Sequence, residues 1–150
     1  MVETDTPEHF DAYLGFSPTW QQFIPKAYNN LFVNYEGQAV ECEICSDKGW
    51  RLEDGGKTMV FDIRQGIKFQ SGQELTSADV AYSLRMAMGE IDGFMSARIG
   101  WMKEYINKIE TPSKYELRIQ LIRPAVVVPK ILSTTFAVII PDGTSRSTFT

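Results

Sequence analysis

The sequence has one histidine, His9, and two cysteines, Cys42 and Cys45. A zinc site built on the two cysteines would need two further ligands, and a Ser-His-Asp or Cys-His catalytic group would depend on His9 alone. Glycine-rich phosphate loops, a Gly-x-Ser-x-Gly elbow and a His-Glu-x-x-His motif are also missing. We therefore expect binding without chemistry, with no metal and no cofactor.

Long apolar runs and concentrations of basic residues are missing as well. The formal net charge is -4 and the lysines and arginines occur singly, so no basic stripe is available for nucleic acid. The longest apolar runs are far shorter than the ~20 residues that cross a bilayer, so we expect no membrane span. Residues 1–5 have no signal-peptide features, which leaves either a cytosolic protein or one whose signal is absent from this sequence.

The cysteines form an isolated Cys-Glu-Ile-Cys motif. Such spacing can serve a redox pair, half of a zinc site, a local disulfide or two free thiols. A thioredoxin-like pair should open a helix, whereas Ser46-Asp47-Lys48-Gly49 is typical of a turn. We expect a local disulfide or two free thiols.

The remaining composition is that of a globular domain, with 43% hydrophobic and 23% charged residues. After an irregular start to Pro18, apolar residues three and four apart predict a helix over residues 20–31. Alternation over residues 50–69, interrupted by Glu53-Asp54-Gly55-Gly56, predicts a β-hairpin whose second strand is half-buried.

A second helix is predicted to start at Ser77. Thr76 and Asp79 have the spacing of a capping box, and Gly89 ends the apolar pattern. Weaker patterns predict a helix over residues 99–105, a turn at 111–114, a strand over 115–121, a short helix over 126–132 and a buried strand over 136–140. Together these elements predict an α+β fold, a small mainly antiparallel sheet with helices packed on one face.

Residues 50–84 carry the most specific pattern, WRLEDGGKTMVFDIRQGIKFQSGQELTSADVAYSL. This stretch resembles the signature of the family 5 extracellular solute-binding proteins: a tryptophan strand, a D-G-K-T-type hairpin, F-x-L-R-x-G-x-K-F and D-G-x-x-L-T-A-x-D-V-x-x-S-L. Ser71-Gly72 replaces the usual Asp-Gly, and Ile63-Arg64 the usual Leu-Arg. Larger departures are a missing first strand and the replacement of Pro-x-Leu-Ala by Glu41-Cys42-Glu43-Ile44-Cys45.

The resemblance implies the ligand-capturing subunit of a peptide- and nickel-type ABC importer, of which this chain is a fragment. It also implies part of lobe I of a type II-like periplasmic-binding-protein fold, with residues 1–40 starting the lobe, 41–140 forming an extra subdomain and 141–150 a frayed tail. The implied partners are a peptide-like or other small solute and the permease of an ABC transporter. The implied location is periplasmic or extracellular, either free or as a membrane-anchored lipoprotein.

Relatives approach the ligand with two loops that match Phe16-Ser17-Pro18-Thr19-Trp20 and Phe94-Met95-Ser96 in this sequence. Phe94 and Trp20 would supply apolar walls, and Ser17 or Thr19 would donate to ligand carbonyls. Structural roles compete with these assignments, since Trp20 can be a core residue and Ser17 a helix cap. Signature residues expected to be scaffold are Phe61, Arg64, Phe69, Asp79 and Leu84.

Two other function classes stay open from the sequence. One is a stand-alone α+β module that binds a protein partner through its sheet edge or exposed aromatics. The other is a hydrolase that uses a pair of carboxylates, such as Glu90 and Asp92. The sequence does not single out any one pair for this role.

Overall fold

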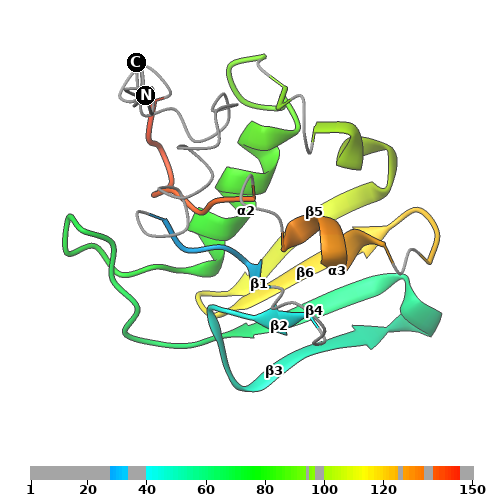
Figure 1. Cartoon of the computed structure of the whole chain (residues 1–150), viewed down its shortest axis with the longest axis horizontal. Coiled ribbons are helices and arrows are strands. Elements are labelled where there is room, and N and C mark those ends of the chain that lie inside the picture. Colours follow the sequence, from blue (N-terminus) through cyan, green and yellow to red (C-terminus); the bar gives the residue numbers. More distant parts are fainter. Residues whose placement is uncertain are drawn as a thin grey trace, which may run out of the picture.

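A four-stranded antiparallel sheet forms the centre of the computed structural model, which describes residues 28–33, 40–93, 95–96, 100–124, 127–133 and 137–145. Its strand order is β3 (Cys45–Glu53), β4 (Thr58–Ile63), β6 (Glu116–Leu121) and β5 (Ile106–Ser113). A second sheet pairs β1 (Phe32–Val33) with β2 (Glu41–Cys42). The helix α2 (Ser77–Ala87) lies against one face of the larger sheet, with the short α3 (Val128–Leu132) nearby (Figure 1). The predicted α+β fold is confirmed.

The predicted hairpin is formed by β3 and β4. Its turn, η1 (Asp54–Gly56), has positive φ angles at all three residues, and Thr58 donates to the Asp54 carboxylate at 2.6 Å. β3 begins earlier than expected, at Cys45, with an irregular register before Trp50 and a positive φ at Gly49. The turn features of residues 46–49 therefore belong to a bulged strand.

β4 is more buried than the alternating pattern predicts. Met59, Phe61 and Ile63 face the core as expected, but Thr58 and Val60 on the other face are buried too. The reason is that β4 is an inner strand, so that Val60 lies in register between Arg51 of β3 and Arg118 of β6, whose long side chains can cover it.

Both ends of α2 match the sequence prediction. The capping box is present at Thr76, where the Asp79 carboxylate accepts from the amide at 2.7 Å and from the hydroxyl at 2.8 Å. At the other end Gly89 has a φ of 81°, its N–H donates to Met86 O, and the Glu90 N–H donates to Arg85 O. This pair of bonds is a Schellman motif, which explains why the helix ends there.

Three predictions of secondary structure for the chain after α2 were wrong in position or type. The turn expected at residues 111–114 is the end of β5, and the chain reverses at Lys114 and Tyr115. The helix expected over 99–105 is a 3₁₀ turn, η2 (Gly100–Glu104), in the described part. In the described part of the strand expected over 136–140, there is an isolated bridge at Val138, although residues 137–140 are buried as predicted.

The helix predicted over 20–31 is absent from its described end, residues 28–31. There Asn30 bridges to Val138, and the Ile139 N–H donates to Asn29 O at 2.9 Å. Phe32 then pairs with Cys42 in β1–β2. Extended pairing with segments remote in sequence has replaced the local helical preference.

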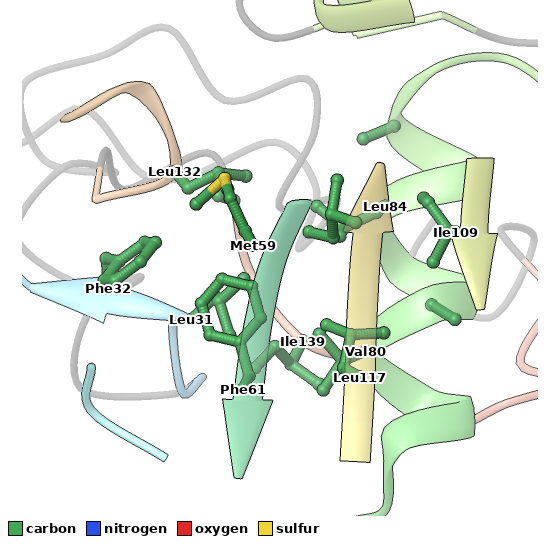
Figure 2. Close-up of a cluster of buried hydrophobic side chains, with 14 of the residues drawn as sticks. Leu31, Phe32, Met59, Phe61, Val80, Leu84, Ile109, Leu117, Leu132 and Ile139 are labelled. Carbon is green, nitrogen blue, oxygen red and sulfur yellow. The ribbon is translucent and has the colours of Figure 1, made fainter. Parts of the chain in front are cut away.

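The core fills the space between the larger sheet, α2, α3 and β1. Figure 2 shows side chains from all of these elements meeting, including Phe32, Phe61, Leu84, Leu117 and Leu132. Phe32 packs edge-on to both Phe61 and Trp50, with ring centroids 5.4 and 5.1 Å apart. Two expected scaffold residues, Phe61 and Leu84, are thus part of the core.

Residues 137–145, here called the strap, run along α2. The Tyr82 hydroxyl donates to Thr144 O at 2.8 Å, and the Asp142 N–H donates to the Asp79 carboxylate at 2.8 Å. The Ile140 N–H also donates to the Ser83 hydroxyl at 2.9 Å. The described beginning of the expected frayed tail, residues 141–145, is therefore hydrogen-bonded to the helix.

Candidate functional site

The second predicted solute loop, here called the candidate solute loop, is described at Met95 and Ser96 and lies at the C-terminal end of α2. Met95 forms an isolated bridge with Met88, and the Ser96 N–H donates to Ala87 O at 2.8 Å. The Gly100 N–H in turn donates to Ser96 O at 2.8 Å. The loop is thereby attached by its backbone to the last turn of the helix.

The two described side chains of this loop differ in accessibility. Met95 is 44% exposed, whereas Ser96 is 1% exposed. The Met95 side chain is therefore partly accessible to solvent, and the buried Ser96 supports the loop through its backbone. Phe94 and the other predicted loop, Phe16 to Trp20, lie outside the described residues.

Two glycines at this loop had no place in the sequence-based site. A Cβ atom on Gly89 would lie 3.2 Å from Met95 Cβ, and a Cβ atom on Gly100 would overlap Met95 Cγ. Gly89 was predicted only as a helix end. Nothing in the sequence pattern distinguishes Gly100, because the close approach depends on the fold.

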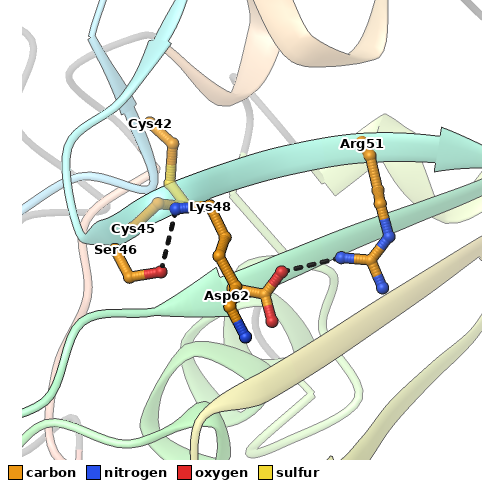
Figure 3. Close-up of a disulfide and its surroundings, with 6 residues drawn as sticks. All are labelled: Cys42, Cys45, Ser46, Lys48, Arg51 and Asp62. Carbon is orange, nitrogen blue, oxygen red and sulfur yellow. Dashed lines mark hydrogen bonds and ion pairs between the residues drawn. A yellow bond between two sulfur atoms is a disulfide. The ribbon is translucent and has the colours of Figure 1, made fainter.

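Cys42 and Cys45 form a disulfide with their Cα atoms 5.4 Å apart (Figure 3). Of the alternatives left open by the sequence, the structure therefore has the local disulfide. Cys42 pairs with Phe32 in the small sheet, and Cys45 pairs with Ile63 in the large one. The disulfide consequently connects the two sheets where they meet.

Glu43 lies between the two cysteines and contacts the segment before β1. Its carboxylate accepts from the Asn30 N–H at 2.7 Å, and its own N–H donates to Leu31 O at 3.1 Å. Burial raises the pKa of Glu43, against the effects of that hydrogen bond and of the Arg64 charge. Asn30 Oδ1 is buried and has no hydrogen-bond partner in the described part of the chain.

The sheet face opposite α2 is covered by charged side chains. Arg51 pairs with Asp62 at 2.7 Å (Figure 3) and with Glu53 at 2.9 Å, and Arg118 pairs with Glu116 at 2.7 Å. An open hollow of about 630 Å³ on this side is lined by Glu110, Thr111, Pro112, Glu116 and Arg118.

This hollow brings two carboxylates near each other, as a hydrolase would require. However, the hydrogen bond from Lys108 lowers the pKa of Glu110, whereas a carboxylic general acid needs a raised pKa. The Glu116 carboxylate is engaged by Arg118. The arrangement is that of mutually neutralised surface charges.

Among the described residues, Glu74 is the carboxylate with the largest change in pKa. Its oxygens accept from Lys114 Nζ at 2.7 Å, from the Gly66 N–H at 2.9 Å and from the Tyr115 hydroxyl at 2.9 Å. These hydrogen bonds, the one from Lys114 most of all, lower the pKa of Glu74 to about 2. They tie the loop before α2 to the β5–β6 turn.

Within the described ranges, no three His, Cys, Asp or Glu side chains are grouped so that they could bind a metal ion. In the same residues, no helix combines the length and apolar character needed to span a bilayer.

Solved structures with a similar fold include binding proteins in complex with small ligands. PBP AgaA of A. tumefaciens R10, in complex with agropinic acid, has a TM-score of 0.77 and 24% identity, covering 91% of this chain and 26% of that one. The oligopeptide-binding protein AppA of Bacillus subtilis, in complex with a nonapeptide, has a TM-score of 0.73 and 20% identity, covering 90% and 26%. These similarities confirm the fold that the family resemblance implies, part of a lobe of a type II-like periplasmic binding protein.

A curated relative is the dipeptide-binding protein DppE of Bacillus subtilis (strain 168). It is 28% identical over 101 residues, which are 65% of this chain and 18% of DppE. The chain thus spans between about a fifth and a quarter of the length of these three proteins.

The family model described as bacterial extracellular solute-binding proteins, family 5 Middle, matches residues 46–149. That range includes the β3–β4 hairpin, the capped helix α2, the β5–β6 hairpin and the strap. By this match over most of its length, the chain belongs to family 5 of the bacterial extracellular solute-binding proteins.

Proposed function

We propose that the chain is part of lobe I of the substrate-binding component of an ABC importer, which captures a peptide-like or other small solute. The observation that carries this proposal is the family match over residues 46–149. It is supported by relatives whose names or bound ligands include a dipeptide, a nonapeptide and agropinic acid. The permease of the importer is the proposed protein partner.

The proposed division of the chain has residues 1–40 in the start of lobe I, 41–140 in an added subdomain and 141–150 as a tail. The proposed solute contacts are Phe16-Ser17-Pro18-Thr19-Trp20 and Phe94-Met95-Ser96. The exposure of Met95 supports a direct contact from the second loop. Because Ser96 is buried in this conformation, the proposal gives the direct contact to Met95 and a supporting role to Ser96.

The proposed location is outside the cytosol, in the periplasm or at the cell surface, either free or lipid-anchored. The disulfide between Cys42 and Cys45 supports this location, because disulfides persist in oxidising compartments and are rare in the cytosol.

In a two-lobed binding protein the cleft closes over the solute, so that both lobes supply contacts. The test is thermal unfolding of the full-length protein and of residues 1–150 with a dipeptide, a nonapeptide and agropinic acid. At a solute concentration of about 100 Kd, binding stabilises the folded state by about 2.7 kcal/mol. We expect at least one solute to raise the melting temperature of the full-length protein and to affect residues 1–150 much less.

A matched pair of variants locates the contact. Met95→Ala should weaken binding, whereas Leu52→Ala, which truncates another exposed apolar side chain at the end of β3, should not. An equal response of the fragment and the full-length protein would contradict the two-lobed site. No response to any of the solutes would contradict the proposed solute class.

A further inference from the structure

We propose that Gly100 is a positioning residue for the solute loop, acting through the side chain of Met95. This inference rests on the proposed function, because it concerns how the same loop is oriented. It adds a residue that lies outside both predicted solute loops.

The first observation is the space around Gly100. A Cβ atom there would overlap Met95 Cγ and would lie 3.0 Å from Met95 Sδ and 3.2 Å from Ala87 O. The Met95 side chain therefore occupies the place that any other residue at position 100 would fill. Gly100 is buried, so this packing is inside the protein, while Met95 is partly exposed.

The second observation is the close approach of the Met95 backbone to Gly89. A Cβ atom on Gly89 would lie 3.4 Å from both Met95 N and Met95 Cα. Gly89 also has a φ of 81°, a conformation that favours glycine. Met95 thus contacts two positions that lack a side chain.

The backbone hydrogen bonds give this packing its effect on the loop. Ser96 donates to Ala87 O and accepts from the Gly100 N–H, so the residues on both sides of the contact are attached to α2. Moving Met95 away from Gly100 would strain these two bonds. The orientation of the exposed part of Met95 therefore depends on the absence of a side chain at position 100.

Gly100 differs from Gly89 in backbone conformation, and this difference allows its role to be tested by substitution. Its φ is not positive, so alanine can adopt the same backbone conformation there, and the main obstacle is the Met95 side chain. Removing that side chain should therefore relieve most of the effect of alanine at position 100. Residues in contact are expected to show such non-additive effects, whereas independent positions are additive.

The experiment uses the full-length protein and whichever of the dipeptide, the nonapeptide and agropinic acid binds the unmodified protein. Dissociation constants are measured for Gly100→Ala, Met95→Ala and the double variant, with amide hydrogen exchange at Ser96 as a second readout. We expect Gly100→Ala to raise the dissociation constant about tenfold and Met95→Ala about threefold. Changes of this size lie within the range of interaction energies measured between contacting residues. The double variant should match Met95→Ala alone, and Ser96 exchange should be faster only in Gly100→Ala.

Effects on the dissociation constant that multiply in the double variant would overturn the inference, as would unchanged Ser96 exchange in Gly100→Ala. If no solute binds the unmodified protein, the proposed function fails, and the Ser96 exchange pattern of the three variants still tests the packing. A merely structural role for Gly100 would lower the melting temperature of Gly100→Ala while leaving its affinity for the solute unchanged.

Discussion

The two faces of the four-stranded sheet are stabilised by different interactions. On one face Met59, Phe61, Leu117 and Ile119 are completely buried beneath α2 and the elements around it. On the other face, ion pairs such as Arg51–Asp62 run across strands and stay partly exposed. Burial of apolar area stabilises a fold far more than exposed ion pairs do, so the apolar face should account for most of the stability.

The two faces also differ in which candidate functional features lie near them. The candidate solute loop and the strap both attach to α2, the helix that packs on the apolar face. The polar face carries a hollow whose charged groups already neutralise one another. The predictions below test this contrast between the faces.

The largest effect is expected from Phe61→Ala. Phe61 is completely buried and its ring lies near those of Phe32 and Trp50. Removing a buried phenylalanine side chain costs about 3–5 kcal/mol of unfolding free energy. Urea denaturation measures this cost, and a loss no larger than that of the polar-face variants would contradict the contrast between the faces.

Asp79→Ala should have the next largest effect, although the residue is polar. Asp79 is 2% exposed, caps α2 at Thr76 and accepts from the Asp142 N–H in the strap. Loss of the cap together with buried donors left unpaired should cost about 2–3 kcal/mol. Denaturation of the variant measures the loss, and hydrogen exchange at Asp142 should increase. The control is Asp142→Ala, which keeps the backbone donor and should cost much less.

Replacing both cysteines by serine should cost about 2 kcal/mol, since closing so short a loop removes little entropy from the unfolded chain. The same loss should appear when the unmodified protein is reduced with a thiol reagent. Reduction of the double serine variant is the control and should change nothing. A cost near that of Phe61→Ala would mean that the disulfide, and not core packing, determines how the two sheets meet.

On the polar face, a double-mutant cycle of Arg51→Ala and Asp62→Ala should give only a small coupling. The side chains are exposed by 45% and 22%, so water and salt weaken their attraction. We expect the melting temperature to fall by a few degrees at most, and the coupling to disappear in 1 M salt by the screening that such ionic strength produces. A large coupling that survives salt would break the contrast.

The smallest effect is expected from Glu74→Gln; it should be greatest at neutral pH and should shrink as the pH falls. The lowered pKa of Glu74, about 2, means that the folded state favours the charged carboxylate. Its contribution to stability is fully present above the ordinary pKa of 4.5 and is lost as the pH falls toward about 2. Denaturation between pH 6 and about 2 should therefore show a smaller loss of stability for Glu74→Gln than for the unmodified protein.

Local sequence signals predicted the elements whose formation depends on neighbouring residues. The β3–β4 hairpin has glycines where φ is positive, and α2 has its cap at Thr76 and its end at Gly89. β5 was missed because Ile106 to Ser113 is an edge strand with few apolar residues and an irregular register near Pro112. The non-helical conformation of residues 28–31 depends on Val138, which is remote in sequence.

For the candidate site, composition and spacing predicted less than the resemblance to a family did. Spacing alone pointed to a fold without catalytic motifs, and the two solute loops came from relatives. The packing of Met95 against Gly89 and Gly100 is a tertiary contact at the end of α2. No periodic pattern encodes such a contact, so Gly100 could be found only in three dimensions.

The bonds between the strap and α2 also bear on how this region forms during synthesis. The strap partners of Asp79, Tyr82 and Ser83 lie 57 to 63 residues later in the chain. When the residues of α2 leave the ribosome during synthesis, the strap residues that complete the polar contacts of the helix have therefore not yet been made. The helix face stays open until the strap emerges, and this region should reach its native state late in translation as a single cooperative step.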